Sequence, residues 1–326
     1  MRVLVTGAAG FIGSHFTRYW LREHPADEVI ALDALTYRGN VANLPEDVPF
    51  VHADIASADV SGVDVVVNFA AESHNSLAVL EPERFFRTNV LGTQALLESC
   101  RRAGVRRFHH VSTCEVYGDL ALDATEAFHE ESPYRPRTPY NASKAGADHA
   151  VRSYHETFDL PVTISNCANN YGPNQFPETV LPLFTTRALT GQQLPIYASS
   201  SHRREWIHVL DHCRAIDAVL HDGDVGRTYH VGTGVEATVD QIADLVLDEL
   251  GLPSSRKSVV ADRPGHDRRY LLDSTRIERE LGWRPEIGFD AGVRDTIRWY
   301  AANRAWWEPL LDRGTIDETA WATTAR

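Results

Sequence analysis

The chain has 326 residues, and its 45 acidic residues outnumber its 32 basic ones, which gives a formal net charge of −13 at pH 7. So acidic a composition, without a basic run, argues against binding to nucleic acid or to an anionic membrane. The sequence has no stretch of about 18 apolar residues and no charged-then-apolar leader, so we expect neither a membrane span nor an export signal.

The cysteines and histidines predict no metal site. The four cysteines are scattered without the spacing of metal ligands, and the 15 histidines also lack the spacing of a zinc site. Cysteines without a pairing pattern are typical of a reducing compartment, so we expect a cytoplasmic protein. They are Cys100, Cys114, Cys167 and Cys213.

The N-terminal segment predicts a dinucleotide cradle. Residues 2–6 form a short β-rich run, and helical periodicity continues through Leu21. The turn between them carries three glycines in the spacing G-x-x-G-x-x-G. Glycines let the backbone approach a pyrophosphate, and the N-terminus of a helix offers free N–H groups with a partial positive charge. We therefore assign cofactor binding to Gly7, Gly10, Phe11, Ile12 and Gly13.

The second predicted strand indicates which dinucleotide binds. Residues 29–32 form this strand, and Asp33 stands at its carboxyl end, twenty residues past Gly13. Its carboxylate can accept hydrogen bonds from the hydroxyls of the adenosine ribose, and it would repel a 2′-phosphate. NAD is therefore predicted rather than NADP. The alternative is an ordinary aspartate in a turn at a strand end.

Strands alternate with helices through about residue 170, which predicts an α/β fold with a doubly wound, parallel Rossmann sheet. Buried strands are expected at residues 65–70 and 108–112, and long helices at residues 84–102 and 140–158. Apolar side chains on these helices would pack against the sheet or against a second subunit. A homodimer is therefore expected, although core packing explains the same pattern. On the first helix these side chains are Val90, Leu91, Leu96 and Leu97.

The composition divides the chain into three predicted parts. Residues 1–170 are expected to form the NAD-binding Rossmann domain. Residues 171–313, richer in proline, glycine and short segments, are expected to form mainly a smaller C-terminal substrate-binding lobe, with a strand near residues 228–232 returning to the main sheet. Residues 314–326 are expected to form a loosely ordered tail.

A tyrosine and a lysine suggest acid–base chemistry. Only two lysines occur in the chain, and Lys144 follows Tyr140 by four residues. On a helix this spacing places both side chains on one face. A fixed ammonium beside a phenol favours the phenolate, so Tyr140 could act as a base near neutral pH. The alternative is an ordinary exposed pair one helical turn apart.

A second polar cluster follows the predicted strand 108–112. In open α/β sheets, ligands bind at the carboxyl ends of the strands. Thr113 could hydrogen-bond the reacting hydroxyl, Glu115 could act as a base and Cys114 could donate a proton. The alternative is a polar turn in which Cys114 is merely small and buried.

Together these segments resemble the extended short-chain dehydrogenase/reductase family, and within it the dTDP-glucose 4,6-dehydratases. The resemblance covers nearly all of residues 1–300. The early segments are general to the family, whereas the later ones are more specific to nucleotide-sugar dehydratases. The matching segments are residues 6–15, 33–40, 70–74, 88–93, 112–120, 139–144, 166–173, 176–178 and 262–267.

The resemblance implies an NAD-dependent nucleotide-sugar lyase. Tyr140, tuned by Lys144, would take the proton from the C4 hydroxyl of the sugar while a hydride passes to NAD⁺. The 4-ketone makes the C5 proton acidic, and Glu115 would remove it. The C6 hydroxyl would leave with a proton from Cys114. Return of the hydride to C6 would give a 4-keto-6-deoxy sugar.

The resemblance also implies the binding residues for a dTDP- or UDP-hexose and for the cofactor. Asn169 and Arg204 resemble ligands of the diphosphate, to which a guanidinium offers a planar fork of donors. The substrate-binding residues are then Ser73, His74, Asn169, Glu178, Arg204, Arg263 and His266. Beyond the cradle and Asp33, the cofactor-binding residues are Asp54, Ile55, Ala70, Ala71, Ser112, Tyr140, Lys144 and Asn166.

Two departures from the family pattern affect the expected reaction. Cys114 replaces the usual aspartate. A thiol with a pKa of about 8.5 is protonated at neutral pH and can donate a proton. The cysteine side chain is shorter than that of aspartate, however, and a misplaced donor weakens catalysis. The arrangement Thr-Cys-Glu resembles that of a nucleotide-hexosamine 5,6-dehydratase. After His74 the family usually continues Val-Asp-Arg-Ser, whereas this chain has residues 75–78 as Asn-Ser-Leu-Ala, which leaves the identity of the hexose open.

The leading prediction is a dTDP-glucose 4,6-dehydratase-like enzyme. A 5,6-dehydratase and a 4-epimerase use the same oxidation at C4 and stay open as alternatives, with a decarboxylase of a nucleotide uronate behind them. An NAD-sensing protein without turnover is a further alternative. It would not need Tyr140, Lys144 and Glu115 together.

Overall fold

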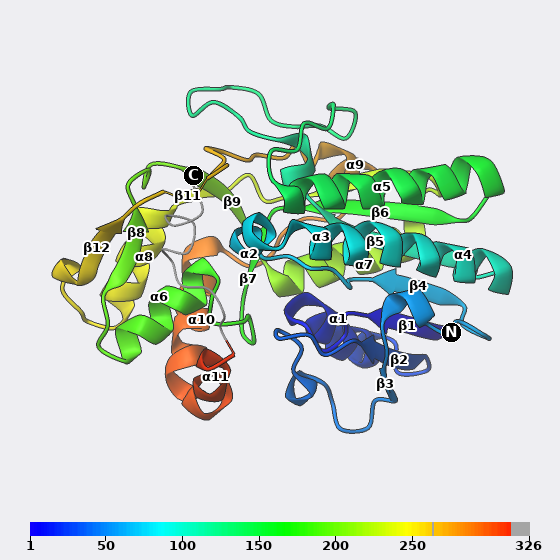
Figure 1. Ribbon diagram of the computed structural model, residues 1–326, viewed down its shortest axis with the longest axis horizontal. Helices are drawn as coiled ribbons and strands as arrows, with labels where there is room; N and C mark the ends of the chain where they lie inside the picture. Colours follow the sequence, from blue (N-terminus) through cyan, green and yellow to red (C-terminus); the bar gives the residue numbers. More distant parts are fainter. Residues whose placement is uncertain (263, 314–326) are drawn as a thin grey trace.

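The computed structural model describes residues 1–262 and 264–313. Arg263 and the predicted tail 314–326 lie outside the described residues. The molecule consists of a large twisted sheet covered by helices and of a smaller lobe beside it (Figure 1).

A seven-stranded sheet, in which all neighbouring strands run parallel, forms the large part. Its spatial order is β10-β6-β5-β4-β1-β2-β3. The order reverses between β1 and β4, which creates a crevice at the carboxyl ends of these two strands, where doubly wound proteins bind ligands. The strands are β1 (Arg2–Thr6), β2 (Glu28–Asp33), β3 (Phe50–His52), β4 (Val65–Asn68), β5 (Arg107–Thr113), β6 (Val162–Cys167) and β10 (Thr228–Val231).

Helices cover both faces of this sheet, which makes it doubly wound (Figure 1). On one face α4 (Thr93–Ala103) and α5 (Pro139–Phe158) pack on the strands, with Leu97 and Val151 in one apolar cluster with Phe108. On the other face α1 (Phe11–Glu23) and α7 (Val209–Asp222) pack side by side. Burial on both faces explains why the strands read as continuous apolar runs. The predicted fold class is confirmed.

The helix predicted at residues 84–102 consists of three consecutive segments. They are α3 (Pro82–Phe85), a π-helical stretch η3 (Phe86–Gly92) and α4. Within η3, Asn89 Oδ1 accepts a hydrogen bond from Glu72 N–H at 2.8 Å, and its Nδ2 donates to Glu72 O at 2.9 Å. The Asn89 side chain thus bonds both backbone groups of Glu72, as a neighbouring strand would. π-Helical turns are frequent near functional sites.

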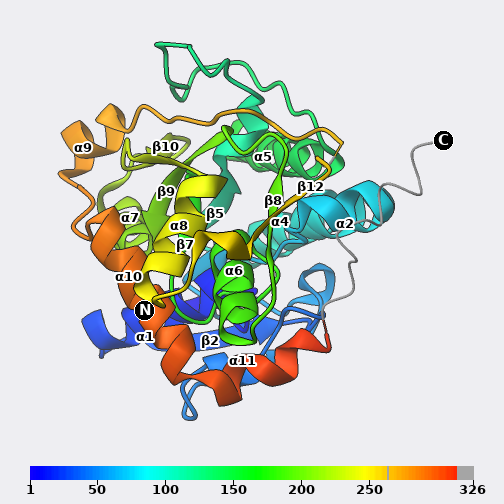
Figure 2. The ribbon, with the colours of Figure 1, turned by 90° about the vertical axis from the view of Figure 1, so that its left-hand side faces the viewer.

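The smaller lobe has its own apolar core, in which α6 (Val180–Leu189), α8 (Val239–Glu249) and α10 (Phe289–Ala302) pack together. This lobe faces the viewer in Figure 2. Its two small sheets are β11 (Glu236–Thr238), β9 (Arg203–His208) and β7 (Asn169–Tyr171), and β12 (Lys257–Val260) with β8 (Leu194–Tyr197). The other short elements are α2 (Asn75–Leu80), α9 (Thr275–Leu281), α11 (Arg304–Leu311), η1 (Val41–Asn43), η2 (Ile55–Ser57), η4 (Cys114–Tyr117) and η5 (Ser254–Arg256).

The chain crosses between the two parts more than once. It leaves the large sheet after β6, enters the lobe at β7 and returns with α7 and β10, and β10 pairs with β6. The predicted domain boundary at residue 170 remains a prediction. Within residues 1–262 and 264–313, no helix combines the length and the apolar content that a membrane span requires.

Candidate active site

A cavity of about 770 Å³ lies at the switch point of the sheet and extends to the smaller lobe. Its lining comes from the turn after β1, the segments that follow β4 and β5, the start of α5, and residues of the lobe. Of the predicted site residues within the described ranges, all line this cavity except Cys114 and Asn166. Arg263 lies outside the described residues.

The glycine turn is shaped by contacts that leave no room for side chains. Gly7 has φ +64°, and a Cβ there would stand 2.7 Å from the backbone nitrogen of Ala70. A Cβ on Gly13 would stand 2.3 Å from the carbonyl oxygen of Gly7. The N-cap of α1 is Gly10, which has no side chain to cap the helix, so the first N–H groups of α1 remain available at the cavity. This end of the cavity fits a pyrophosphate.

Asp33 ends β2 at the wall of the same cavity. One carboxylate oxygen accepts from Ala9 N–H at 3.0 Å and the other from Leu35 N–H at 2.7 Å. Burial raises the pKa of Asp33, and these backbone hydrogen bonds oppose the rise. An ionised carboxylate has about four acceptor sites, so these two hydrogen bonds leave acceptor capacity for a ribose hydroxyl. Asp54 caps η2 by accepting from Ala56 N–H at 2.8 Å. The cradle and Asp33 together fit NAD.

Tyr140 and Lys144 lie on the first turns of α5, buried and facing the cavity. Lys144 Nζ donates to Val111 O at 2.8 Å and lies 3.3 Å from His110 Nε2. Burial lowers the pKa of Lys144. The ammonium is thus held at the end of β5, on the cavity side of the sheet.

The electrostatics of Tyr140 differ from the sequence-based expectation. Burial raises the pKa of Tyr140 well above its usual value, and the charge of Glu115 raises it further. A hydrogen bond with Thr113 acts in the opposite direction. The pKa of Tyr140 is thus raised in this structure although Lys144 lies one helical turn away.

The Thr-Cys-Glu cluster is split by the turn that follows β5. Thr113 caps η4, accepting from Glu115 N–H at 3.2 Å, and both residues line the cavity. Cys114 turns to the other side, where it is 1% exposed and packs in an apolar cluster with Val116 and Tyr270. Burial, and then the charge of Glu115, raises the pKa of Cys114 well above its usual value. The thiol is therefore protonated but stands behind the cavity wall.

Asn166 lies behind the same wall. It is fully buried, and its Nδ2 donates to Thr113 O at 3.1 Å. Ser112 Oγ donates to the buried Asp148 at 2.9 Å, and Tyr134 OH donates to the same oxygen at 2.7 Å. Asn166 therefore supports the end of β5 in this structure, and its predicted contact with the cofactor remains a prediction.

The predicted substrate residues line the part of the cavity next to the lobe. Arg204 on β9 donates to Asp267 O at 2.7 Å, and its guanidinium lies 4.8 Å from the centre of the Tyr270 ring. His266 Nδ1 lies 3.2 Å from Ser199 Oγ. Asn169 begins β7. All three line the same cavity, although about one hundred residues separate Asn169 from His266 in the sequence.

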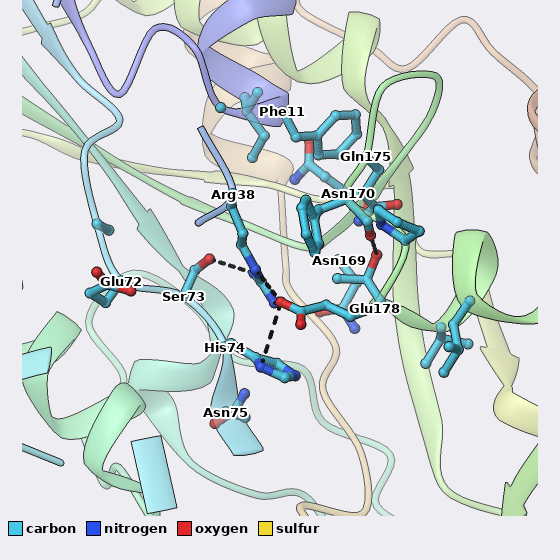
Figure 3. Close-up of a pocket in the computed structure, with 18 of the residues that line it drawn as sticks. Phe11, Arg38, Glu72, Ser73, His74, Asn75, Asn169, Asn170, Gln175 and Glu178 are labelled. Carbon is cyan, nitrogen blue, oxygen red and sulfur yellow. Dashed lines mark hydrogen bonds and ion pairs between the residues drawn. The ribbon is translucent and has the colours of Figure 1, made fainter. Parts of the chain in front are cut away.

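Glu178 is part of a polar cluster that bridges the two parts of the molecule. Arg38 Nε donates to Glu178 Oε1 at 2.5 Å, and Arg38 Nη1 donates to Ser73 Oγ at 3.0 Å. His74 Nδ1 lies 3.6 Å from the same Glu178 oxygen (Figure 3). Tyr37 OH also donates to Glu178, at 2.5 Å. In this structure Glu178 thus joins the loop after β2 to the lobe.

Several cavity residues were not predicted from the sequence. They are Arg38, Asn75, Cys167 and Tyr270, among others. Arg38 and Cys167 lie inside segments that resemble the family, and Asn75 is the first residue of the segment 75–78 that differs from the family pattern. The sequence therefore gave a reason to consider all three as site residues. Burial raises the pKa of Cys167 to about 12, so this thiol is also protonated, and unlike Cys114 it lines the cavity. Tyr270 had no local signal.

Known proteins similar to this chain include NAD-dependent nucleotide-sugar enzymes, as the site geometry leads one to expect. Residues 4–296 match the model of the family described as GDP-mannose 4,6 dehydratase. The chain is 46% identical over 324 residues to the dTDP-glucose 4,6-dehydratase of Streptomyces niveus, which covers 95% of this chain and 96% of that protein. The crystal structure of DesIV, a dTDP-glucose 4,6-dehydratase from Streptomyces venezuelae with NAD and TYD bound, superposes with a TM-score of 0.92 at 50% identity, covering 95% of this chain and 100% of that one. A UDP-glucose 4-epimerase from Thermotoga maritima superposes with a TM-score of 0.87 at 28% identity, covering 93% of this chain and 100% of that one.

The fold and the site define an extended short-chain dehydrogenase/reductase that works on nucleotide sugars. Within this class, the chain belongs to the GDP-mannose 4,6 dehydratase family. The predicted resemblance and the predicted function, an NAD-dependent lyase of the dTDP-glucose 4,6-dehydratase type, are confirmed.

Proposed function

We propose that this protein oxidises a dTDP- or UDP-linked hexose at C4, eliminates water across C5 and C6, and releases a 4-keto-6-deoxy sugar. The observation that carries the proposal is that Thr113, Glu115 and Tyr140 share one cavity whose other end is the dinucleotide cradle. Bound NAD would supply the hydride acceptor and a positive charge beside the phenol.

Tyr140 is the proposed base for the C4 hydroxyl. A phenol whose pKa is raised by burial needs a nearby cation to ionise. Lys144 lies one helical turn away, and its ammonium is anchored at Val111 O. Thr113 is placed to hydrogen-bond the phenol and the reacting hydroxyl. Positioned proton transfers of this kind contribute about 10²–10⁴ in rate.

Glu115 is the proposed base for C5. As it takes the proton, the electron pair of the C5–H bond forms the double bond to C6, and the C6–O bond breaks. The leaving hydroxide needs a proton to depart as water. We propose Cys114 as this donor because its thiol is protonated and it directly precedes Glu115; to donate, its side chain would have to turn from the apolar cluster to the cavity. Cys167 is a second protonated thiol and lines the cavity.

One observation favours a second candidate, a 4-epimerase. Cys114 packs behind the cavity wall, and without a donor at C6 the oxidised sugar would only be reduced again at C4. The similarity to the Thermotoga maritima epimerase agrees with this possibility. A 5,6-dehydratase, which loses water and returns the hydride to C4, differs from both candidates in its product.

The proposal includes the partners and the location. Asn169 and Arg204, which line the cavity, would hold the diphosphate, and Arg263 and His266 would make further contacts with the nucleotide. We further propose a homodimer whose interface is formed by η3, α4 and α5. Leu91 in η3 is 63% exposed and Phe158 at the end of α5 is 49% exposed. A cytoplasmic location is supported by four free, buried cysteines.

A product analysis tests the proposal. The protein is incubated with dTDP-glucose, UDP-glucose, UDP-N-acetylglucosamine and UDP-glucuronate, and each product is weighed and examined by NMR. Loss of water with a new C6 methyl group supports the 4,6-dehydratase. Loss of water with a C5–C6 alkene indicates the 5,6-dehydratase, an unchanged mass with inverted C4 the epimerase, and loss of carbon dioxide the decarboxylase. Failure to reduce bound NAD with any of these sugars would refute the proposal.

A further inference from the structure

Glu115 is held by a side chain from the segment that departs from the family pattern. Asn75 begins α2 and lines the cavity next to His74 (Figure 3). Its Nδ2 donates a hydrogen bond of 2.9 Å to Glu115 Oε2. Residues 75–78 are the segment that departs from the expected family pattern, in which a valine without a side-chain donor follows His74.

The amide of Asn75 is fixed at its other end by the N-cap of α5. Thr138 Oγ1 donates to Asn75 Oδ1 at 2.9 Å and accepts from Asn141 N–H at 3.2 Å. Since the Asn75 oxygen is occupied, its NH₂ group faces Glu115, and an ionised carboxylate can only accept. Thr138 is buried. A hydrogen-bonded chain thus joins Glu115 to the first turn of the helix that carries Tyr140.

A second hydroxyl near Glu115 does not replace this contact. Tyr270 OH lies 3.5 Å from Glu115 Oε2, at the limit of a hydrogen bond. The same hydroxyl donates to Asp267 Oδ2, which is its closer acceptor. A phenol has one proton to donate. Of these two donors, Asn75 makes the shorter hydrogen bond to Glu115 Oε2.

We propose that Asn75 is a positioning residue for dehydration, which orients the Glu115 carboxylate at the cavity through the hydrogen bond to Oε2. This inference rests on the proposed function, in which Glu115 removes the C5 proton. Asn75 itself would touch neither the reacting carbon nor the leaving hydroxyl.

Several titratable groups lie around Glu115. The titratable groups that face it are Cys114 on η4, Tyr140 on α5, Cys167 at the end of β6, and Tyr270, next to which Asp267 and Arg204 lie. The four thiols and phenols have raised pKa values, so they are neutral and bring no positive charge to the carboxylate. A hydrogen bond to a carboxylate stabilises its charged form, and loss of the bond raises its pKa.

The test compares wild type with Asn75→Val, which has a similar size but no donor, over a range of pH. The first measurement is C4 oxidation, followed by the absorbance of reduced nicotinamide. The second is removal of the C5 proton, followed by exchange with deuterated solvent. We expect C4 oxidation to change much less than C5 exchange, because Asn75 contacts Glu115 directly and Tyr140 only through Thr138 and the first turn of α5. We expect C5 exchange at neutral pH to fall about tenfold and its acidic limb to move up by about one pH unit, as for loss of one charge-assisted hydrogen bond.

Further variants keep the test decisive. Asn75→Asp retains the acceptor for Thr138 and adds a like charge, so a larger upward shift is expected; it also serves if the valine variant does not fold. Asn303→Ala, at the end of α10 and outside the cavity lining, is the matched control. The proposal is overturned if both Asn75 variants keep the wild-type pH profile of C5 exchange.

An infrared titration of the Glu115 carboxyl band separates this inference from the proposed function. If wild type reduces no bound NAD, the proposed function fails, and the titration still decides the role of Asn75. A higher pKa of Glu115 in Asn75→Val than in wild type supports the inference. Equal values overturn it.

Discussion

Replacing Gly13 by alanine should remove NAD from the protein while leaving the fold in place. The added Cβ would stand 2.3 Å from the carbonyl oxygen of Gly7, and ordinary contact begins at 3.4 Å, so the turn must open by the difference, about 1.1 Å. The atoms it meets are backbone and cannot rotate away. Overpacking of this kind costs about 1–3 kcal/mol, and a misplacement of about 1 Å at a functional group costs about 10²-fold.

The assay measures NAD released per protein chain after acid precipitation, together with the melting temperature with and without added NAD. We expect Gly13→Ala to melt a few degrees lower and to have lost its bound NAD and the stabilisation by added NAD. Gly10→Ala should show a smaller loss, because its Cβ would meet Gly7 O at 3.1 Å.

Gly288→Ala is the control, because a Cβ there meets no atom within 4 Å and its φ of −62° suits any residue. It should retain wild-type NAD content and lose only a little stability, because Gly288 is the N-cap of α10 and alanine is a poorer cap than glycine. Wild-type NAD content in Gly13→Ala would show that the turn does not form the pyrophosphate site, and the assignment of the cradle would be wrong.

The remaining predictions concern the proton transfers and the dimer. Tyr140→Phe should lower C4 oxidation about 10²–10⁴-fold. In wild type, the rate of C4 oxidation should rise with pH through neutrality. The raised pKa of Tyr140 keeps the phenol protonated there, and only the phenolate is a base. A rate that does not depend on pH would contradict the assignment of Tyr140 as the base. Cys114→Ala should slow water loss far more than C4 oxidation. If water loss is undiminished in Cys114→Ala and is slowed in Cys167→Ala, the proton donor is Cys167. Leu91→Asp, on a side chain that is 63% exposed, should shift the protein from dimer to monomer in size-exclusion chromatography with light scattering, and an unchanged mass would place the interface elsewhere.

Local pattern was sufficient for the sheet and for the cofactor end of the site. The strands at residues 2–6, 29–32 and 108–112 agree with β1, β2 and β5 to within one residue at each end, because a strand buried on both faces must be a continuous apolar run. The glycine turn and Asp33 were predictable for a related reason. A backbone cradle followed by a strand-end carboxylate is encoded within a short stretch of consecutive residues.

Only the tertiary structure decided which side of a turn each reactive group occupies. Thr113, Cys114 and Glu115 are consecutive in the sequence, yet the cap of η4 turns Cys114 into an apolar cluster while its neighbours line the cavity. The contact between Asn75 and Glu115 joins residues 40 positions apart, and no local periodicity describes such a pair. The pKa of Tyr140 depends likewise on burial, which is set by everything packed around the phenol and not by the spacing to Lys144 alone.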